Sequence, residues 1–149
     1  MLEMKCSRPV AAPPARVFEV VSDLRNTAGR VKGITKMEVL TDGPVRKGTR
    51  FRETRTMFGR DATEEMEITA FDPPRSYTME CKNHGCHYVS EFRVKPTAAG
   101  SELELSFQAR PLTLFAKVMG TLMRPLAKKL VASCSKDLDD LARAAEGRS

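Results

Sequence analysis

The sequence predicts an α+β protein in which a curved antiparallel β-sheet of about six or seven strands wraps around a long C-terminal helix. Two observations lead to this prediction. Several strand-like runs follow one short helical segment, and the chain then closes with residues 112–145, which are apolar along one broad side. An antiparallel sheet with one solvated face needs its other face covered, and no other segment is large enough. A sheet wrapped around one helix tends to enclose a cavity, which favours binding of a small hydrophobic molecule.

Length and charge fit a single domain over residues 1–149. The chain is 41% apolar and carries 25 basic and 19 acidic residues, a net charge of +6. Arg and Glu alternate through 50–67, so we expect a solvated sheet surface and no nucleic-acid binding. No apolar run approaches the roughly 20 residues of a membrane span, and residues 1–14 lack the core of a secretory signal. We therefore expect a cytoplasmic protein without stable membrane insertion, and leave a homodimer open.

The first 33 residues predict a strand and two short helices. Residues 2–10 alternate weakly and end in Ala-Ala-Pro-Pro, which is typical of an edge strand followed by a break. Pro13 and Pro14 suit the first turn of a helix, where a missing N–H costs nothing. Residues 27–33, with two glycines, allow one more short helical turn. The apolar side of the first helix is expected to contain Val17, Phe18, Val21 and Leu24.

From residue 34 onward the apolar period changes from 3.6 to 2, which indicates strands. Short loops between them favour an antiparallel meander. Asp72-Pro73-Pro74 should end one strand, because neither proline can donate to a ladder. In the run before it, Met66, Ile68 and Ala70 are expected to share a face. The predicted strands are 34–40, 49–58, 62–71, 76–83, 86–95 and 101–110.

The C-terminal segment should not be one straight helix. A continuous helix over 112–145 would be about 50 Å long, well beyond the roughly 30 Å width of a small domain. We therefore expect a break near Arg124-Pro125. The remaining helix should place Lys128, Lys129, Lys136 and Arg143 in water. Its sheet-facing side should contain Leu126, Leu130, Cys134, Leu138 and Leu141.

Several short motifs accompany this order of elements: APPARVF at 12–18, VSDL at 21–24, GTRF at 48–51, AFDPPR at 70–75 and the tail 138–146. With them, nearly the whole chain resembles the START-like or Bet v 1-like superfamily (SRPBCC) with the helix-grip fold, in particular its polyketide cyclase/dehydrase and lipid-transport group. The resemblance implies a deep cavity between sheet and terminal helix, used for lipids, sterols and polyketides. Some members cyclise or dehydrate a polyketide and others only carry a ligand, so it implies no catalytic residues here.

Strand alternation predicts which side chains face the cavity. On 49–58 the set Phe51, Glu53, Arg55, Met57 is more apolar than the alternate set and should point inward. Glu53 and Arg55 could hold a bound carboxylate or phenol, pair with each other, or lie at a wet rim. An apolar pocket with a few polar groups is typical of small-molecule sites, although the same side chains could fill a solid core. The other predicted lining residues are Met66, Ile68, Tyr77, Met79, Tyr88, Ser90, Phe92, Leu105, Phe107, Leu126 and Leu130.

The four cysteines, at 6, 81, 86 and 134, are expected to be thiols in a reducing compartment. Cys81 and Cys86 could face each other across a hairpin and pair on oxidation. With His84 and His87 they place four potential metal ligands within residues 81–87. Neighbours on a strand point to opposite faces, however, so Cys86 and His87 cannot easily meet at one ion. We therefore expect no metal and no cofactor.

Whether the protein is an enzyme stays open. The sequence has no nucleophile elbow and no Gly-rich phosphate loop, so acid or base chemistry would fall to Tyr77, Tyr88, Glu53 or Arg55. Binding or transport of a small hydrophobic ligand is the preferred interpretation, with a polyketide cyclase or dehydratase as the alternative. A third interpretation is a basic surface that meets an acidic protein or membrane, at Arg124, Lys128 and Lys129.

Overall fold

The computed structural model describes residues 2–57, 59–83, 85–122 and 127–147. The chain runs through β1 (Leu2–Val10), α1 (Pro14–Ser22), η1 (Leu24–Asn26), α2 (Thr27–Arg30), β2 (Ile34–Val39), β3 (Arg50–Met57), β4 (Arg60–Asp72), β5 (Ser76–Asn83), β6 (Cys86–Thr97), β7 (Gly100–Pro111), α3 (Leu114–Leu122) and α4 (Ala127–Ala145). The predicted strands and the short helices after the first strand are confirmed.

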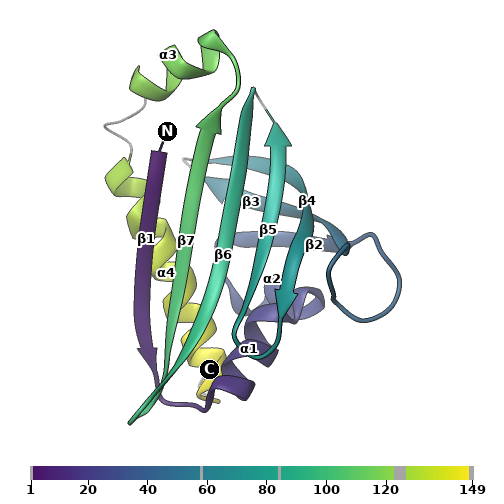
Figure 1. Ribbon diagram of the computed structural model, residues 1–149, viewed down its shortest axis with the longest axis vertical. Coiled ribbons are helices and arrows are strands. Elements are labelled where there is room, and N and C mark those ends of the chain that lie inside the picture. Colours follow the sequence, from purple (N-terminus) through teal and green to yellow (C-terminus); the bar gives the residue numbers. More distant parts are fainter. Residues whose placement is uncertain (1, 58, 84, 123–126, 148–149) are drawn as a thin grey trace.

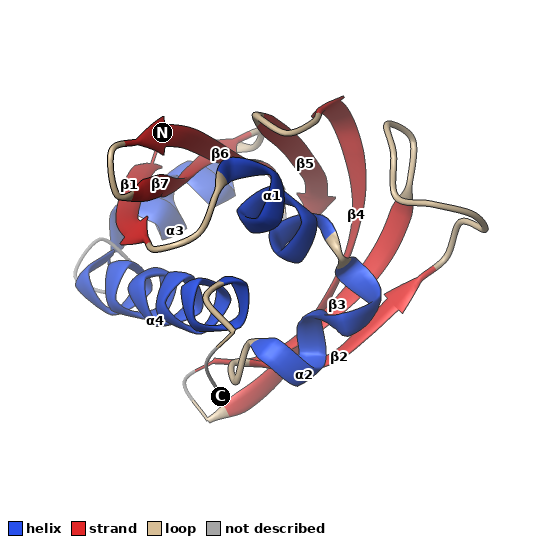
Figure 2. Ribbon diagram, turned by 90° about the horizontal axis from the view of Figure 1, so that it is seen from below, coloured by secondary structure: helices blue, strands red, loops and turns tan. Residues whose placement is uncertain are grey.

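The strands form one antiparallel seven-stranded sheet in the order β1-β7-β6-β5-β4-β3-β2. Strands β2 to β7 make a meander. The first strand, β1, pairs with the last, β7, and Cys6 lies opposite Leu105. The sheet curves so that its concave face partly encloses α4 (Figure 1, Figure 2). This is the predicted α+β arrangement of a curved sheet around a C-terminal helix.

Helices α1 and α2 cover one end of the sheet, and α3 lies at the other end (Figure 1). α1 begins at Pro14, whose missing N–H leaves no hydrogen bond unmade in a first turn. Its apolar side, with Val17 and Phe18, is buried as the helical spacing predicts. The Phe18 ring lies 5.5 Å from Phe71 and 6.0 Å from Tyr77, measured between ring centroids, so aromatic packing fixes α1 on the sheet.

A β-bulge in β4 corrects one prediction about strand faces. The register between β4 and β5 shifts between Ile68 and Ala70, after which Phe71 lies opposite Tyr77. Ala70 is exposed, and Phe71 packs against the core instead. The prediction that Ala70 shares a face with Ile68 is therefore wrong, because one extra residue in a strand reverses the alternation beyond it.

The C-terminal segment forms two helices, as predicted. Helix α3 ends at Leu122 and α4 begins at Ala127, and the predicted break at Arg124-Pro125 lies between them, outside the described residues. The buried side of α4 includes Cys134, Leu138 and Leu141, which confirms the predicted sheet-facing side. Lys128, Lys129 and Lys136 are exposed as expected, and Arg143 is half-buried beside Asp140. No helix in the described ranges is long and apolar enough to cross a bilayer.

A disulfide and an ion pair fix α4 to β1. Cys6 and Cys134 are bonded although 128 positions separate them in the sequence, because β1 and α4 lie side by side. The prediction that both are thiols is wrong, since sequence distance concealed that the two elements are neighbours. Two residues after Cys6, Arg8 pairs with Asp139 at 3.2 Å. These contacts hold α4 against one edge of the sheet.

Two further contacts fix α4 toward the opposite edge. The guanidinium of Arg55, on β3, lies 2.8 Å from a carboxylate oxygen of Asp137. Asp140, one turn further along α4, accepts a hydrogen bond of 3.0 Å from the backbone N–H of Lys32, just before β2. α4 therefore spans the open side of the curved sheet, with contacts near both of its edges.

Candidate ligand cavity

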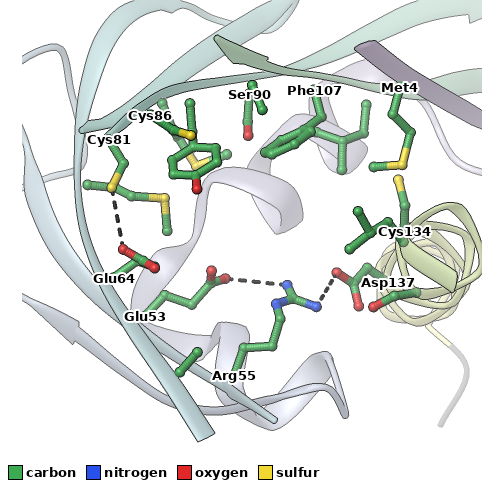
Figure 3. A pocket seen from close by; sticks show the side chains of 18 of the residues that line it. Met4, Glu53, Arg55, Glu64, Cys81, Cys86, Ser90, Phe107, Cys134 and Asp137 are labelled. Atoms are coloured by element: carbon green, nitrogen blue, oxygen red, sulfur yellow. Dashed lines mark hydrogen bonds and ion pairs between the residues drawn. The ribbon is translucent and has the colours of Figure 1, made fainter. Parts of the chain in front are cut away.

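A cavity of about 910 Å³ lies between the concave face of the sheet and α4. Such a volume falls within the range of sites for small organic molecules, about 300–1,000 Å³. Most of the side chains around it are apolar, and Figure 3 shows the charged groups gathered on one side. The interior of the protein is therefore hollow, and these side chains do not meet in a solid core.

Most of the predicted lining residues surround this cavity; whether they contact a ligand remains a prediction. Ile68 does not line it, and its side chain is fully buried in the packed cluster with Val17. Leu126 lies outside the described residues, as does the side chain of Met57. The predicted residues found on the cavity surface are Phe51, Glu53, Arg55, Met66, Tyr77, Met79, Tyr88, Ser90, Phe92, Leu105, Phe107 and Leu130.

The two tyrosines that sequence analysis singled out differ in their contacts. The Tyr77 hydroxyl donates a 2.8 Å hydrogen bond to the carbonyl of Val21 on α1, and its ring is only 1% exposed. Burial raises the pKa of Tyr77 far above its ordinary range. Its donor is thus already used by the backbone of α1. Tyr88 stacks on Phe107 with 5.9 Å between ring centroids, and burial raises its pKa to about 12, so its phenol is neutral at physiological pH.

An ion-pair network crosses the cavity from β3 to α4. Arg55 lies 3.5 Å from Glu53 and 2.8 Å from Asp137, and each of the three side chains is less than one fifth exposed. Burial raises the pKa of Glu53 and that of Asp137 above their ordinary values, although Arg55 opposes both shifts. Glu53 and Arg55 therefore pair with each other inside the protein, and they do not lie at a wet rim.

A third carboxylate, Glu64, lies on the next strand. In the β3–β4 register Glu64 is directly opposite Glu53, and both side chains point into the cavity (Figure 3). Glu64 accepts hydrogen bonds from the Asn83 amide and, at 3.6 Å, from the Cys81 thiol. Burial and the nearby carboxylate raise the pKa of Cys81 to about 11, which keeps this thiol neutral. Like charges directly opposite on a sheet repel, so this side of the cavity disfavours further negative charge.

Sequence reasoning missed Glu64 and Asp137, although a signal for each is present. Glu64 is two residues before Met66 and shares its strand face. Asp137 follows Leu130 by seven residues, which is two helical turns, and so lies on the cavity side of α4. A charged side chain is normally expected in water, and this expectation hid both residues. Periodicity is the better guide than residue type at these two positions.

The cysteine and histidine run divides between the two faces of the sheet. Cys81 and Cys86 are free thiols on the cavity side, and they do not pair with each other. His87 points to the outer side, where its Nε2 lies 2.7 Å from Glu80. Neighbours on β6 thus face opposite ways, as expected from strand geometry. His84 lies outside the described residues.

Helix α3 contributes cavity residues that the sequence did not predict, among them Phe115, Lys117 and Met119. Phe115 is 74% exposed and Met119 39% exposed, although both also line the cavity. A side chain can have both properties only where the cavity meets solvent. The α3 end of the molecule is therefore where the cavity opens.

Comparison with known proteins agrees with this geometry. A family described as "Polyketide cyclase / dehydrase and lipid transport" matches residues 1–146. No curated protein sequence is similar enough to count as a relative.

Among solved structures, the fold is similar to that of TTHA0849 from Thermus thermophilus, with a TM-score of 0.81, 20% identity and 98% of each chain covered. It is also similar to major latex-like protein 151 from Panax ginseng, with a TM-score of 0.78, 11% identity and 97% of each chain covered. The di-domain ARO/CYC StfQ of the steffimycin biosynthetic pathway gives a TM-score of 0.78 and 14% identity, over 97% of this chain and 50% of StfQ. These identities establish the helix-grip fold alone.

Proposed function

Because this chain belongs to the polyketide cyclase/dehydrase and lipid transport family, we propose that it binds and carries a small hydrophobic molecule of the lipid or polyketide kind. The observation that carries the proposal is the cavity of about 910 Å³, enclosed by the sheet and α4 and lined mainly by apolar side chains. An apolar guest would replace the solvent in this space and gain the free energy of leaving water.

Area burial alone gives weak binding. A ligand that buries about 300 Å² of apolar surface gains about 7.5 kcal/mol at about 25 cal/mol per Å². Association costs at least about 4 kcal/mol of this. The polar groups of the cavity would therefore decide which hydrophobic molecule is retained.

These polar groups favour a ligand whose polar end donates hydrogen bonds. Glu53, Glu64 and Asp137 supply three carboxylates, and the one guanidinium among them, that of Arg55, is already paired twice. A ligand carboxylate would add a further acidic group beside these three, which disfavours its binding. An alcohol, phenol or amine can instead donate to the carboxylates. The proposed ligand class is thus apolar molecules with a hydroxyl or amino end.

The experiment tests whether the hollow interior holds the ligand. In Ser90→Trp an indole would occupy the cavity, whereas in Glu91→Trp the same side chain would point to the opposite face of β6. The probe is N-phenyl-1-naphthylamine, an uncharged fluorophore. We expect the natural protein and Glu91→Trp to bind it alike, and Ser90→Trp to bind it at least tenfold more weakly. Equal binding by both variants, or no binding by the natural protein, would overturn the proposal.

One observation favours an enzyme as the second candidate. Glu53 is buried in the cavity with a raised pKa, which suits a carboxyl group that gives or takes a proton. A cyclase or dehydratase would then act on a poly-β-keto thioester. If the protein is such an enzyme, Glu53→Gln should abolish turnover of this thioester and leave binding of the fluorescent probe intact. If the protein is only a carrier, the natural protein should not turn over the thioester at all.

The location of the protein belongs to the proposal as well. The sequence favours the cytoplasm, but the Cys6–Cys134 disulfide opposes it, because structural disulfides are rare in reducing compartments. Thiol counting on protein from a lysate quenched with alkylating agent would decide. If the protein is denatured during alkylation, two alkylated cysteines, Cys81 and Cys86, mean that the disulfide exists in the cell, and four mean that it does not.

A further inference from the structure

The excess positive charge of the chain is concentrated in one segment. Between Glu104 and Asp137 there is no acidic residue, and this segment contains Arg110, Lys117, Arg124, Lys128, Lys129 and Lys136. The rest of the chain has 19 basic and 19 acidic residues, so the net charge of +6 belongs entirely to residues 105–136. A charge distribution of this kind orients a protein toward a negatively charged surface.

The same segment contains most of the exposed apolar surface. Of the eight large apolar side chains that are exposed in the described part of the chain, seven lie between residues 112 and 131, and only Leu40 lies elsewhere. Proteins seldom expose such a group of apolar side chains without a partner for it. The seven are Leu112, Leu114, Phe115, Val118, Met119, Leu122 and Val131.

Helix α3 is apolar along one broad side. Phe115, Ala116 and Met119 line the cavity. Leu114, Val118 and Leu122 follow each other at intervals of four residues, so they form a stripe beside Phe115 and Met119, and they are 78%, 52% and 67% exposed. None of these three lines the cavity. The apolar side of a helix is normally packed against other apolar groups, and here much of that side faces solvent.

We propose that α3, with the basic residues around it, docks on the surface of an anionic lipid bilayer, so that the open end of the cavity meets the membrane. The stripe of Leu114, Val118 and Leu122 would enter the boundary between headgroups and acyl chains. Exposed basic side chains such as Arg110 and Lys128 would lie near the lipid phosphates. This helix lies on the membrane and does not span it.

Charge decides between a bilayer and a second copy of the chain. Two copies joined through this surface would bring two segments of charge +6 together. An anionic bilayer instead supplies both the apolar layer and the opposite charge that the segment needs. The bilayer is therefore the occupant that the surface fits.

The contacts that hold α4 on the sheet lie away from this end. The disulfide of Cys134 and the ion pairs of Asp137 and Asp139 hold α4 from its middle onward, away from α3. α1 and α2 cover the opposite end of the sheet (Figure 1). Docking at α3 would therefore bring the open end of the cavity to the lipid and leave the anchored part of the fold outside the docking surface.

The test is co-sedimentation of the full chain with large vesicles. Vesicles of phosphatidylcholine alone are compared with vesicles containing about 30% phosphatidylserine, at low and high salt. We expect binding to the anionic vesicles only, and loss of most of it at high salt. Leu114→Ser/Val118→Ser should reduce the partition coefficient at least tenfold. Leu40→Ser removes an exposed apolar side chain outside the segment and should bind as the natural protein does.

The outcome is separable from the cavity proposal. Binding of N-phenyl-1-naphthylamine should be unchanged in Leu114→Ser/Val118→Ser, which also shows that this variant is folded. Equal binding to both vesicle types, no binding to either, or equal binding by this variant and Leu40→Ser would overturn the membrane proposal. A dimer in sedimentation equilibrium that the double variant abolishes, without vesicle binding, would mean that the surface meets a second copy instead.

Discussion

The hydroxyl groups of Tyr77 and Tyr88 have different roles, and removing each hydroxyl oxygen in turn tests this difference. Tyr77→Phe removes the donor to the Val21 carbonyl and leaves that oxygen unsatisfied in the core. Such a loss costs about 1–3 kcal/mol. Tyr88→Phe, beside an open cavity, should cost less. Urea unfolding of both variants measures the difference in the free energy of unfolding, and an equal loss in the two would contradict the role assigned to Tyr77.

Glu53 should make stability depend on pH in a definite direction. Burial raises its pKa above the ordinary 4.5, so the folded protein holds this proton more tightly than the unfolded chain does. Its stabilising contribution is complete below that value and is lost as pH rises through the raised pKa. Glu53→Gln keeps a neutral side chain throughout.

We therefore expect the free energy of unfolding of Glu53→Gln, relative to the natural protein, to rise with pH above the ordinary 4.5, over the range in which Glu53 loses its proton. Urea titrations across this range measure the trend. Glu3→Gln, on an exposed position of β1, removes the same charge without burial and serves as control. A constant difference between Glu53→Gln and the natural protein would contradict the assignment.

Among individual residues, the sequence predicts side-chain direction better than side-chain contacts. Alternation along β3 places Phe51, Glu53 and Arg55 on the cavity side, where the structure has them. The third partner of the network, Asp137, comes from α4, 82 positions beyond Arg55. No local pattern encodes which distant carboxylate reaches a given guanidinium, since that depends on how the helix is placed on the sheet.

At the level of elements, α4 is the part whose position depends most on cross-links. The disulfide between Cys6 and Cys134 closes a separation of 128 residues. In the chain-entropy account, closing a loop of this size stabilises a protein by roughly 4–5 kcal/mol. Cys6→Ala/Cys134→Ala should therefore lower the free energy of unfolding by an amount of this order, and a reductant should do the same to the natural protein.

The control for this prediction is internal. Reductant should leave the unfolding curve of Cys6→Ala/Cys134→Ala unchanged, because the remaining Cys81 and Cys86 are already thiols. If the natural protein is equally stable with and without reductant, α4 is held by its packing and ion pairs alone.

The elements themselves were predictable because their patterns are local. Two prolines at the start of α1, a period of two along the strands and glycines at the turns each act within a few residues. The bulge in β4 was not predictable, since Ala70 is a residue that a core-facing position accepts readily. Nor was the Cys6–Cys134 bond, which depends on β1 and α4 becoming neighbours only in the folded chain.

For the whole molecule, the carboxylates of the cavity predict selectivity among ligands of equal apolar size. Decanol, decylamine and decanoate share a chain and differ in the polar end. Since Glu53, Glu64 and Asp137 outnumber the cations on the cavity surface, Arg55 and Lys117, decanol and decylamine should displace N-phenyl-1-naphthylamine at concentrations at least tenfold below that of decanoate. In Glu53→Gln the difference between the displacing concentrations of decanol and decanoate should be smaller. Tighter binding of decanoate than of decanol would contradict the proposed ligand class.

Fold class follows from the sequence here because a half-buried sheet followed by one large amphipathic helix has few stable arrangements. The volume of the cavity does not follow. The same alternating side chains could meet in the middle, and only the curvature of the sheet and the distance at which α4 is held leave the interior open. Those distances arise from contacts between elements far apart in sequence, such as Arg55 with Asp137.

The register that sets Glu53 opposite Glu64 links ligand occupancy to acidity. A guest that displaces solvent from between these side chains should make it harder to keep both ionised, so we expect loading to take up a proton at Glu53, the one of these two residues whose pKa is already raised. By mass action, an uncharged guest is then held more tightly in mildly acidic surroundings and released in alkaline ones. Calorimetry in buffers of different ionisation enthalpy would count that proton directly.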